Sequence, residues 1–173
     1  IDGDALTFAV TMQPANGTVM ITDATTGAYT YTPNADYNGT DSFSFTVNDG
    51  TTDSAPATVT LTVTPANDAP IANDGSLSLQ EDALGNGTLT ASDIDGDALT
   101  YAVAAQPANG SVMITNASTG AYTYTPNADY NGTDSFTFVA NDGTTDSNVA
   151  TITITISALN DAPVASNSSE TVD

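Results

Sequence analysis

The chain repeats itself with a period of 93 residues, and this limits its fold more than any other feature. The segment IDGDALTFAV from Ile1 recurs as IDGDALTYAV from Ile94, and residues 1–80 align without a gap with residues 94–173. Of those 80 pairs 55 are identical, and residues 31–40 recur unchanged as residues 124–133. Self-similarity at a fixed period predicts an array of structural units, each the size of a small domain.

The limits of these units follow from a second motif. NDAP occurs at residues 67–70 and again at 160–163, and its proline and short polar residues are typical of a linker. We therefore predict one complete repeat over residues 67–159. Residues 1–66 are the expected rear of an N-terminally truncated repeat, and residues 160–173 a linker with the opening strand of a third repeat.

Within the complete repeat the hydrophobic pattern has a period of two, which predicts strands. Phe136, Phe138 and Ala140 alternate with Ser, Thr and Val, and three isoleucines between residues 151 and 157 alternate with threonines. The predicted strands cover residues 76–80, 88–92, 99–104, 111–115, 121–125, 135–141 and 150–157. Seven short strands in about 93 residues fit an all-β fold of tandem immunoglobulin-like, seven-stranded β-sandwiches. Tyr37 and Tyr130 each precede a strand where such sandwiches often carry a tyrosine corner.

The composition excludes most chemistry. The chain has 21 acidic residues, a formal charge of −21 and no Lys, Arg, His, Cys or Trp. It therefore lacks an ordinary general base near neutral pH, a thiol nucleophile, a Schiff-base amine and any disulfide. We predict a protein that is not an enzyme. Nucleic acid and anionic membrane surfaces require basic side chains, so the sequence predicts no nucleic-acid partner. No run approaches the ~18 apolar residues that span a bilayer, so it also predicts no direct membrane insertion.

The acidic residues gather where strands are expected to end. Asp93, Asp95 and Asp97 alternate in SDIDGD, and Glu81 and Asp142 each follow a predicted strand. Single aspartates in loops are explained by turns and caps. Three acids within five positions, in a chain without basic side chains, point to a bound cation, and oxygen-rich sites suit Ca²⁺. The spacing does not fit an EF-hand, so we expect a site assembled from separate loops.

Several segments together resemble a known family. They are SDIDGDALTY, QPANGSVMI, GAYTYTPNADYNGTDSFTF, ANDG and ITITISALNDAP, and they are similar to the cadherin-like, VCBS-type tandem repeats of large bacterial surface proteins and adhesins. The resemblance covers essentially the whole chain. It implies an immunoglobulin-like sandwich, an extracellular or cell-surface location in bacteria, and a role as an extender or adhesive module.

Cadherins bind calcium between successive domains, and the resemblance carries part of that pattern onto this chain. It implies one site from Asn67, Asp68, Asp93, Asp95 and Asp142, with Asp97 in the same acidic turn. It implies that Glu81, Asn160 and Asp161 serve the next junction. In the truncated repeat, the residues equivalent to members of the first of these sites are Asp2, Asp4 and Asp49.

The resulting functional prediction is a non-enzymatic extracellular repeat that Ca²⁺ stiffens, with neighbouring repeats of the same chain as partners. Two alternatives stay open. One is a self-assembling filament of identical chains, in which the tail from Val164 onward donates a strand to the next molecule. The other is an adhesive module that binds carbohydrate or another ligand.

Overall fold

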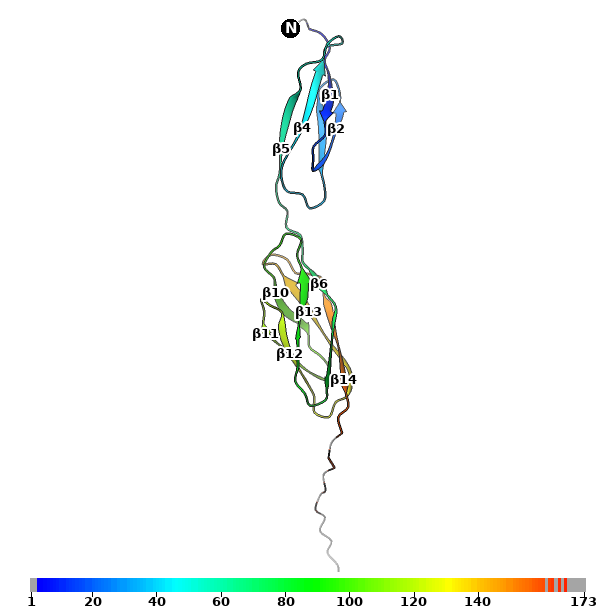
Figure 1. Ribbon diagram of the computed structural model, residues 1–173, viewed down its shortest axis with the longest axis vertical. Coiled ribbons are helices and arrows are strands. Elements are labelled where there is room, and N and C mark those ends of the chain that lie inside the picture. Colours follow the sequence, from blue (N-terminus) through cyan, green and yellow to red (C-terminus); the bar gives the residue numbers. More distant parts are fainter. Residues whose placement is uncertain (1–2, 161, 164, 166, 168–173) are drawn as a thin grey trace, which may run out of the picture. The chain divides into compact units, whose positions relative to one another are not determined.

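The structure of the chain is a computed structural model that describes residues 3–160, 162, 163, 165 and 167. These residues form β-strands and connecting loops, and none of them lies in a helix. The chain divides into two compact units, unit 1 (Ile1–Asn67) and unit 2 (Asp68–Asp173), whose strands are shown in Figure 1. The prediction of an all-β, immunoglobulin-like fold is confirmed.

Unit 2 is a sandwich of two main sheets. One has the strand order β10–β13–β14–β7, the other has the order β11–β12–β8, and β6 and β9 form a separate pair. All neighbouring strands are antiparallel except β14 and β7, which run parallel. The strands are β6 (Ile71–Asn73), β7 (Gly75–Gln80), β8 (Gly85–Thr88), β9 (Thr90–Ser92), β10 (Thr100–Ala105), β11 (Gly110–Asn116), β12 (Ala121–Pro126), β13 (Gly132–Asn141) and β14 (Ala150–Ser157).

The core of unit 2 lies between these sheets. Phe136 and Phe138 of β13 are buried, as are the isoleucines of β14, so the predicted alternation of inward and outward residues is confirmed. The ring of Tyr122 stands edge-on to that of Phe136, with 5.1 Å between the ring centres, a favourable arrangement for two aromatic rings. The aromatic residues of unit 2 therefore serve mainly to fill its core.

The predicted strand 88–92 is wrong as a single element. Leu89 divides it into β8, which pairs with β12, and β9, which pairs with β6. The Leu89 N–H donates to the carbonyl of Gly120 at 2.9 Å and the side chain is buried, so the chain changes sheets while its apolar residue fills the core. A period-two pattern cannot show this change, because both halves keep the same alternation.

The strand β6 was not expected, since its sequence follows the linker motif and is short. It is held by Asn148, whose side-chain amide donates to the Ala72 carbonyl at 3.0 Å and whose oxygen accepts from the Ala72 N–H at 2.9 Å. Because these partners are 76 residues apart in the sequence, no local pattern could reveal them.

Unit 1 repeats only part of this architecture. Its strands form a sheet of order β1–β4–β5 and a pair β2–β3. Counterparts of β6 to β9 are absent from the described residues 3–67. Tyr29 is consequently 40% exposed, whereas its counterpart Tyr122 is 3% exposed. The strands of unit 1 are β1 (Thr7–Met12), β2 (Gly17–Asp23), β3 (Ala28–Pro33), β4 (Gly39–Asn48) and β5 (Ala57–Val63).

The two expected tyrosine corners lie at equivalent places. The Tyr130 hydroxyl donates to the Thr133 carbonyl, and the Tyr37 hydroxyl donates to the Thr40 carbonyl, both at 2.7 Å. The bond runs three residues forward along the chain, whereas the corner of immunoglobulin domains runs back. Each tyrosine therefore fixes the loop that leads into its long strand.

The prediction that the acidic residues gather at strand ends is wrong for Asp134. It lies inside β13, is 8% exposed, and accepts hydrogen bonds from the N–H groups of Ala108, Asn109 and Ser135 and from the Tyr124 hydroxyl, at 2.8–3.1 Å. Burial alone would raise the pKa of this carboxyl, but the four donors together hold it below its ordinary value. Asp134 therefore ties the loop before β11 to the core and is structural.

Candidate metal site

Three of the predicted ligands lie together in the turn between β9 and β10. Asp93, Asp95 and Asp97 each place a carboxylate oxygen within 4.8 Å of the other two. Gly96 has a φ of +79°, a conformation that glycine adopts without steric cost, and it allows the turn between Asp95 and Asp97. The alternation that the sequence shows is thus converted into a convergent group of carboxylates.

The two carboxylate oxygens of Asp93 have different surroundings. Its Oδ1 accepts hydrogen bonds from the N–H groups of Asp95 at 2.9 Å and Asp97 at 3.4 Å, which fixes the carboxylate. Its Oδ2 is buried and has no hydrogen-bond partner. A buried carboxylate oxygen without a partner is costly. Oδ2 is therefore the atom of this cluster that a bound cation would satisfy.

The start of unit 2 is joined to the cluster. The N–H of Asp68 donates to Oδ2 of Asp95 at 2.8 Å. Asp68, which the resemblance assigns as a ligand, thus meets the cluster through its backbone, a contact that the sequence does not reveal. It directly links the residues where the chain enters unit 2 to the acidic turn.

The electrostatics of the cluster are unfavourable without a cation. Two unit charges about 5 Å apart repel by about 1 kcal/mol even in water, and here there are three such pairs. The chain has no Lys, Arg or His to neutralise them. A divalent cation would turn this mutual repulsion into attraction and supply the partner that Asp93 lacks.

Asp142 and its counterpart Asp49 lie in equivalent loops after β13 and β4. Oδ1 of Asp142 accepts from the N–H and hydroxyl of Thr144 and the N–H of Thr145 at 2.6–2.8 Å. Oδ1 of Asp49 accepts the same three bonds at 2.7–2.9 Å, and these bonds lower the pKa of its carboxyl, with the Thr51 hydroxyl as the largest cause. One oxygen of each aspartate thus closes its own loop.

The second predicted group lies at the other end of unit 2, beside the end of β14. Glu81 is only 4% exposed and accepts from the Leu159 N–H at 2.6 Å and the Asn131 amide at 3.2 Å. Asn160 follows Leu159 and is exposed. Near Glu81, the Asp129 N–H donates to Oδ1 of Asp82 at 3.3 Å, so Asp82 and Asp129 join this acidic end, although the sequence did not single them out as ligands.

The remaining predicted ligands lie at or beyond the ends of unit 1 and of the described residues. Asp4 is exposed ahead of β1, and Asn67 is exposed at the end of unit 1. Asp2 and Asp161 lie outside the described residues. Their roles as ligands stay predictions.

Sequence comparison places the chain in a family. The profile of the bacterial Ig domain matches residues 1–62 and 67–155, and the chain belongs to this family. The chain is also 32% identical over 112 residues to integrin beta-like protein B of Dictyostelium discoideum, a match that covers 57% of this chain and 6% of that protein. It thus spans a small fraction of the length of this relative.

A solved structure shares the fold. Repeats EC1-2 of human protocadherin-24 match with a TM-score of 0.63 and 18% identity, over 94% of this chain and 84% of theirs. An endo-fucoidan hydrolase of glycoside hydrolase family 107 matches with a TM-score of 0.42 and 27% identity, over 91% of this chain and 24% of that enzyme, and a likeness that low carries no argument. The fold and the family together define an immunoglobulin-like, cadherin-like bacterial repeat.

This class indicates an extracellular adhesion or structural domain, and the fold favours a non-enzymatic role. In the described part of the chain, no helix is long and apolar enough to cross a membrane. The acidic turn at residues 93–97 is the feature of this fold that most needs a functional explanation.

Proposed function

We propose that this chain is part of a cell-surface extender or adhesin in which Ca²⁺ binds the acidic turn and stiffens the connection between repeats. The observation that carries the proposal is the carboxylate group of Asp93, Asp95 and Asp97, in which Oδ2 of Asp93 is buried without a partner. The family and fold supply the extracellular setting, where calcium is present near millimolar concentration.

The donor set fits Ca²⁺ better than other common metals. All three side chains offer carboxylate oxygens, which are the hard ligands that Ca²⁺ prefers. Zinc and copper sites are built from His and Cys, and the chain has neither. Bound Ca²⁺ would supply positive charge, and the residues of this chain would hold it through Oδ2 of Asp93 and the carboxylates of Asp95 and Asp97.

The effect on the linker follows from the hydrogen bond between Asp68 and Asp95. Neutralising the cluster would relieve the repulsion that loosens the turn, and the turn is bonded to the first residue of unit 2. Extracellular-type sites have a Kd of about 10⁻⁴–10⁻³ M, which at millimolar calcium corresponds to about 0.4–1.4 kcal/mol per site. This stabilisation is small for a fold but sufficient to restrict a hinge, and an array of repeats would add such effects.

The first test is calcium binding by calorimetry on the whole chain. We expect a site with a Kd of about 10⁻⁴–10⁻³ M, and we expect Asp93→Asn to weaken it at least tenfold because the substitution removes a charge from the buried, unpartnered position. Magnesium should compete poorly, since it prefers a small, strictly octahedral shell.

The matched control is Asp23→Asn in unit 1. Asp23 is exposed, and its Oδ1 accepts from the N–H and hydroxyl of Thr25, bonds that Asn116 makes at the equivalent turn of unit 2, so the substitution changes the net charge equally without touching a predicted ligand. If Asp23→Asn weakens binding as much as Asp93→Asn does, calcium is held by diffuse charge. If calcium gives no heat of binding with the parent chain or with the variants, a site at residues 93–97 is also contradicted.

A further inference from the structure

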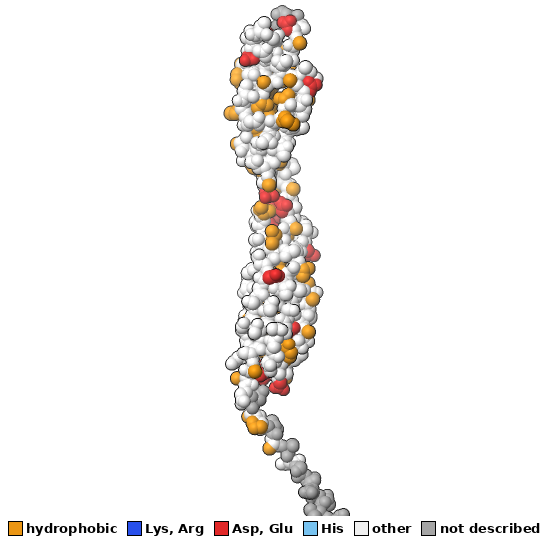
Figure 2. Space-filling model, turned by 90° about the vertical axis from the view of Figure 1, so that its right-hand side faces the viewer, with side chains coloured by type: hydrophobic (Ala, Val, Ile, Leu, Met, Phe, Trp, Pro, Cys, Tyr) orange, Lys and Arg blue, Asp and Glu red, His pale blue; other side chains and the backbone are white. Residues whose placement is uncertain are grey.

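A short sequence motif recurs on the surface of the chain. On the face that Figure 2 shows, charged and hydrophobic side chains are scattered over a larger area of other side chains and backbone. The motif Asn-X-Ser/Thr occurs seven times, at Asn16, Asn38, Asn86, Asn109, Asn116, Asn131 and Asn167. It is the acceptor sequence of N-linked glycosylation, a modification of exposed segments in exported proteins. The fold decides which of these asparagines can present its side-chain amide to an enzyme.

Three of these asparagines are held by the fold. Asn109 and its counterpart Asn16 are half-buried, and the backbone N–H of each donates to a buried aspartate at 2.9 Å. The side-chain amide of Asn131 donates to Glu81 at 3.2 Å. An acceptor amide has to enter the active site of the modifying enzyme, so these three are poor acceptors in the folded chain. Asn167 belongs to a motif whose other residues lie outside the described part of the chain.

The exposed asparagines of unit 2 differ in their backbone. Asn86 lies within β8, where it pairs with Thr123 of β12. Its segment cannot bend into an enzyme without breaking that ladder. Asn116 is the last residue of β11 and is followed by the turn at residues 117–120, which leads into β12. Asn116 therefore lies at the tip of a hairpin.

A β-bulge turns Asn116 toward solvent. Val112 and Ile114 pack on the core, so the strict alternation of a strand would also point Asn116 inward. The register of β11 against β12 shifts between Ile114 and Asn116, and a bulge of this kind re-aims the side chains beyond it. Asn116 is consequently exposed.

The turn holds the side-chain amide of Asn116 in one orientation. Its Oδ1 accepts from the N–H groups of Ser118 at 3.0 Å and Thr119 at 3.3 Å, and from the Ser118 hydroxyl at 2.8 Å. Backbone N–H groups only donate, so the atom that they contact is the amide oxygen. The amide NH2 group is left free of hydrogen bonds to described residues. The amide and the hydroxyl that define the motif thus lie together on an exposed turn.

Unit 1 has the same turn with an aspartate. Oδ1 of Asp23 accepts from the N–H of Thr25 at 2.8 Å, from its hydroxyl at 2.7 Å and from the N–H of Thr26 at 3.4 Å. The register of β2 against β3 also shifts, between Ile21 and Asp23. The turn therefore forms with either residue, and only an asparagine offers an amide nitrogen to a sugar.

We propose that Asn116 is an N-glycosylation site. The co-reactant is a sugar whose anomeric carbon carries a pyrophosphate leaving group. A bond forms between Nδ2 of Asn116 and the anomeric carbon, the bond from that carbon to the pyrophosphate oxygen breaks, and Nδ2 loses one proton. The extracellular class of the domain supports this assignment, which is independent of calcium binding. An exposed turn of small residues is also a preferred site of proteolysis, and a glycan would cover it.

The experiment treats the folded full chain with UDP-glucose and a soluble bacterial N-glycosyltransferase that modifies a peptide of residues 111–121. Intact mass spectrometry should show the addition of one hexose. Because the chain has no Lys or Arg, the hexose is mapped to Asn116 after cleavage at aspartate rather than with trypsin. Asn116→Asp should abolish the addition, and Asp23 shows that this turn tolerates aspartate.

The reciprocal variant should create a site in unit 1. Asp23→Asn produces Asn-Ala-Thr in a turn where the Thr25 hydroxyl already donates to residue 23 at 2.7 Å, so this variant should gain a second hexose. The double variant with Asn116→Asp has the net charge of the parent and should carry its hexose in unit 1 alone. Misfolding cannot imitate this result, because it would open the other motifs and spread the sugar among them.

Three results would overturn the proposal. The first is a parent chain that gains no hexose under conditions in which the peptide of residues 111–121 is modified. The second is a hexose that maps to Asn38 or Asn86 and persists in Asn116→Asp. The third is an Asp23→Asn variant that gains no second hexose, because the turn would then not be what selects the acceptor.

Discussion

Phe138→Ala is expected to lower the free energy of unfolding of unit 2 by about 4 kcal/mol, the usual cost of removing a fully buried phenylalanine. Its side chain lies between the two sheets and is completely buried. The same substitution at its counterpart, Phe45→Ala in unit 1, should cost about half as much, because Phe45 lines an open pocket and is only partly buried.

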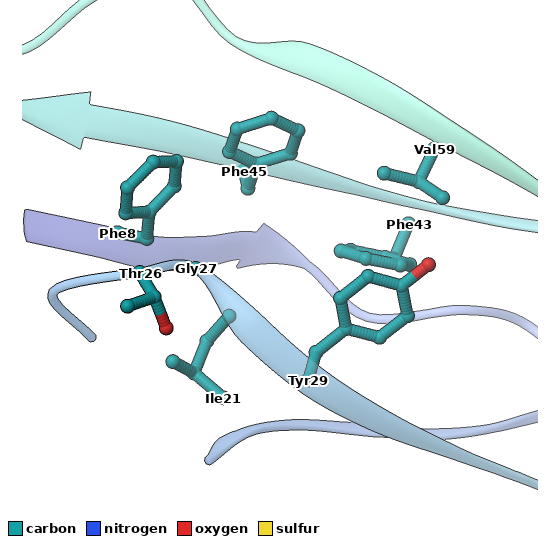
Figure 3. A pocket seen from close by; sticks show the side chains of 8 residues that line it. All are labelled: Phe8, Ile21, Thr26, Gly27, Tyr29, Phe43, Phe45 and Val59. Atoms are coloured by element: carbon teal, nitrogen blue, oxygen red, sulfur yellow. The ribbon is translucent and has the colours of Figure 1, made fainter. Parts of the chain in front are cut away.

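The repeat supplies an internal control for this comparison. Phe43 and Phe136 are counterparts that are both 1% exposed, so Phe43→Ala and Phe136→Ala should have similar effects on their own units. The measurement is denaturant unfolding followed by NMR signals assigned to each unit. Equal losses for Phe45→Ala and Phe138→Ala would show that the pocket of unit 1 that Phe45 lines (Figure 3) is closed in solution.

Asp134→Ala is expected to destabilise unit 2 by about 3 kcal/mol, since it leaves buried donors without their charged acceptor. The Ala108 and Asn109 N–H groups and the Tyr124 hydroxyl all lose a bond of 2.9–3.1 Å. A variant within 0.5 kcal/mol of the parent at pH 7 would show that water replaces the carboxylate at little cost.

The pH dependence of stability tests whether the charge of Asp134 stabilises unit 2. The folded-state pKa of Asp134 lies below its ordinary value of 3.8, so its carboxylate stabilises unit 2 above that pH, and this contribution is lost as the pH falls through the folded-state pKa. The difference in stability between the parent and Asp134→Asn should therefore be largest near pH 7 and shrink below pH 4. A difference in stability that stays constant with pH would mean that the geometry of the hydrogen bonds, and not the charge, stabilises unit 2.

The sequence predicted the strands well where apolar and polar residues alternate at every second position. The alternation around Phe136 and Phe138 placed β13 and its buried face correctly, and β14 was predicted at its observed limits. The change of sheet at Leu89 and the short strand β6 could not be predicted, because both depend on bonds to Gly120 and Asn148, which lie far away in the chain.

The candidate site was predictable to a similar extent. Alternating aspartates pointed to residues 93–97, and the structure places those three carboxylates together. The buried and unpartnered state of Asp93 Oδ2 depends on how the turn packs, which composition does not encode. Asp134 looked like another loop acid because its neighbours are polar, and only the tertiary fold shows that it is buried in β13.

Small-angle scattering from the whole chain, first in EDTA and then with millimolar calcium, tests the proposed stiffening most directly. Calcium should narrow the distribution of maximum dimensions that the chain adopts, and Asp93→Asn combined with Asp95→Asn should abolish this response while Asp23→Asn preserves it. Scattering curves that coincide in EDTA and in calcium for the parent chain would contradict the account.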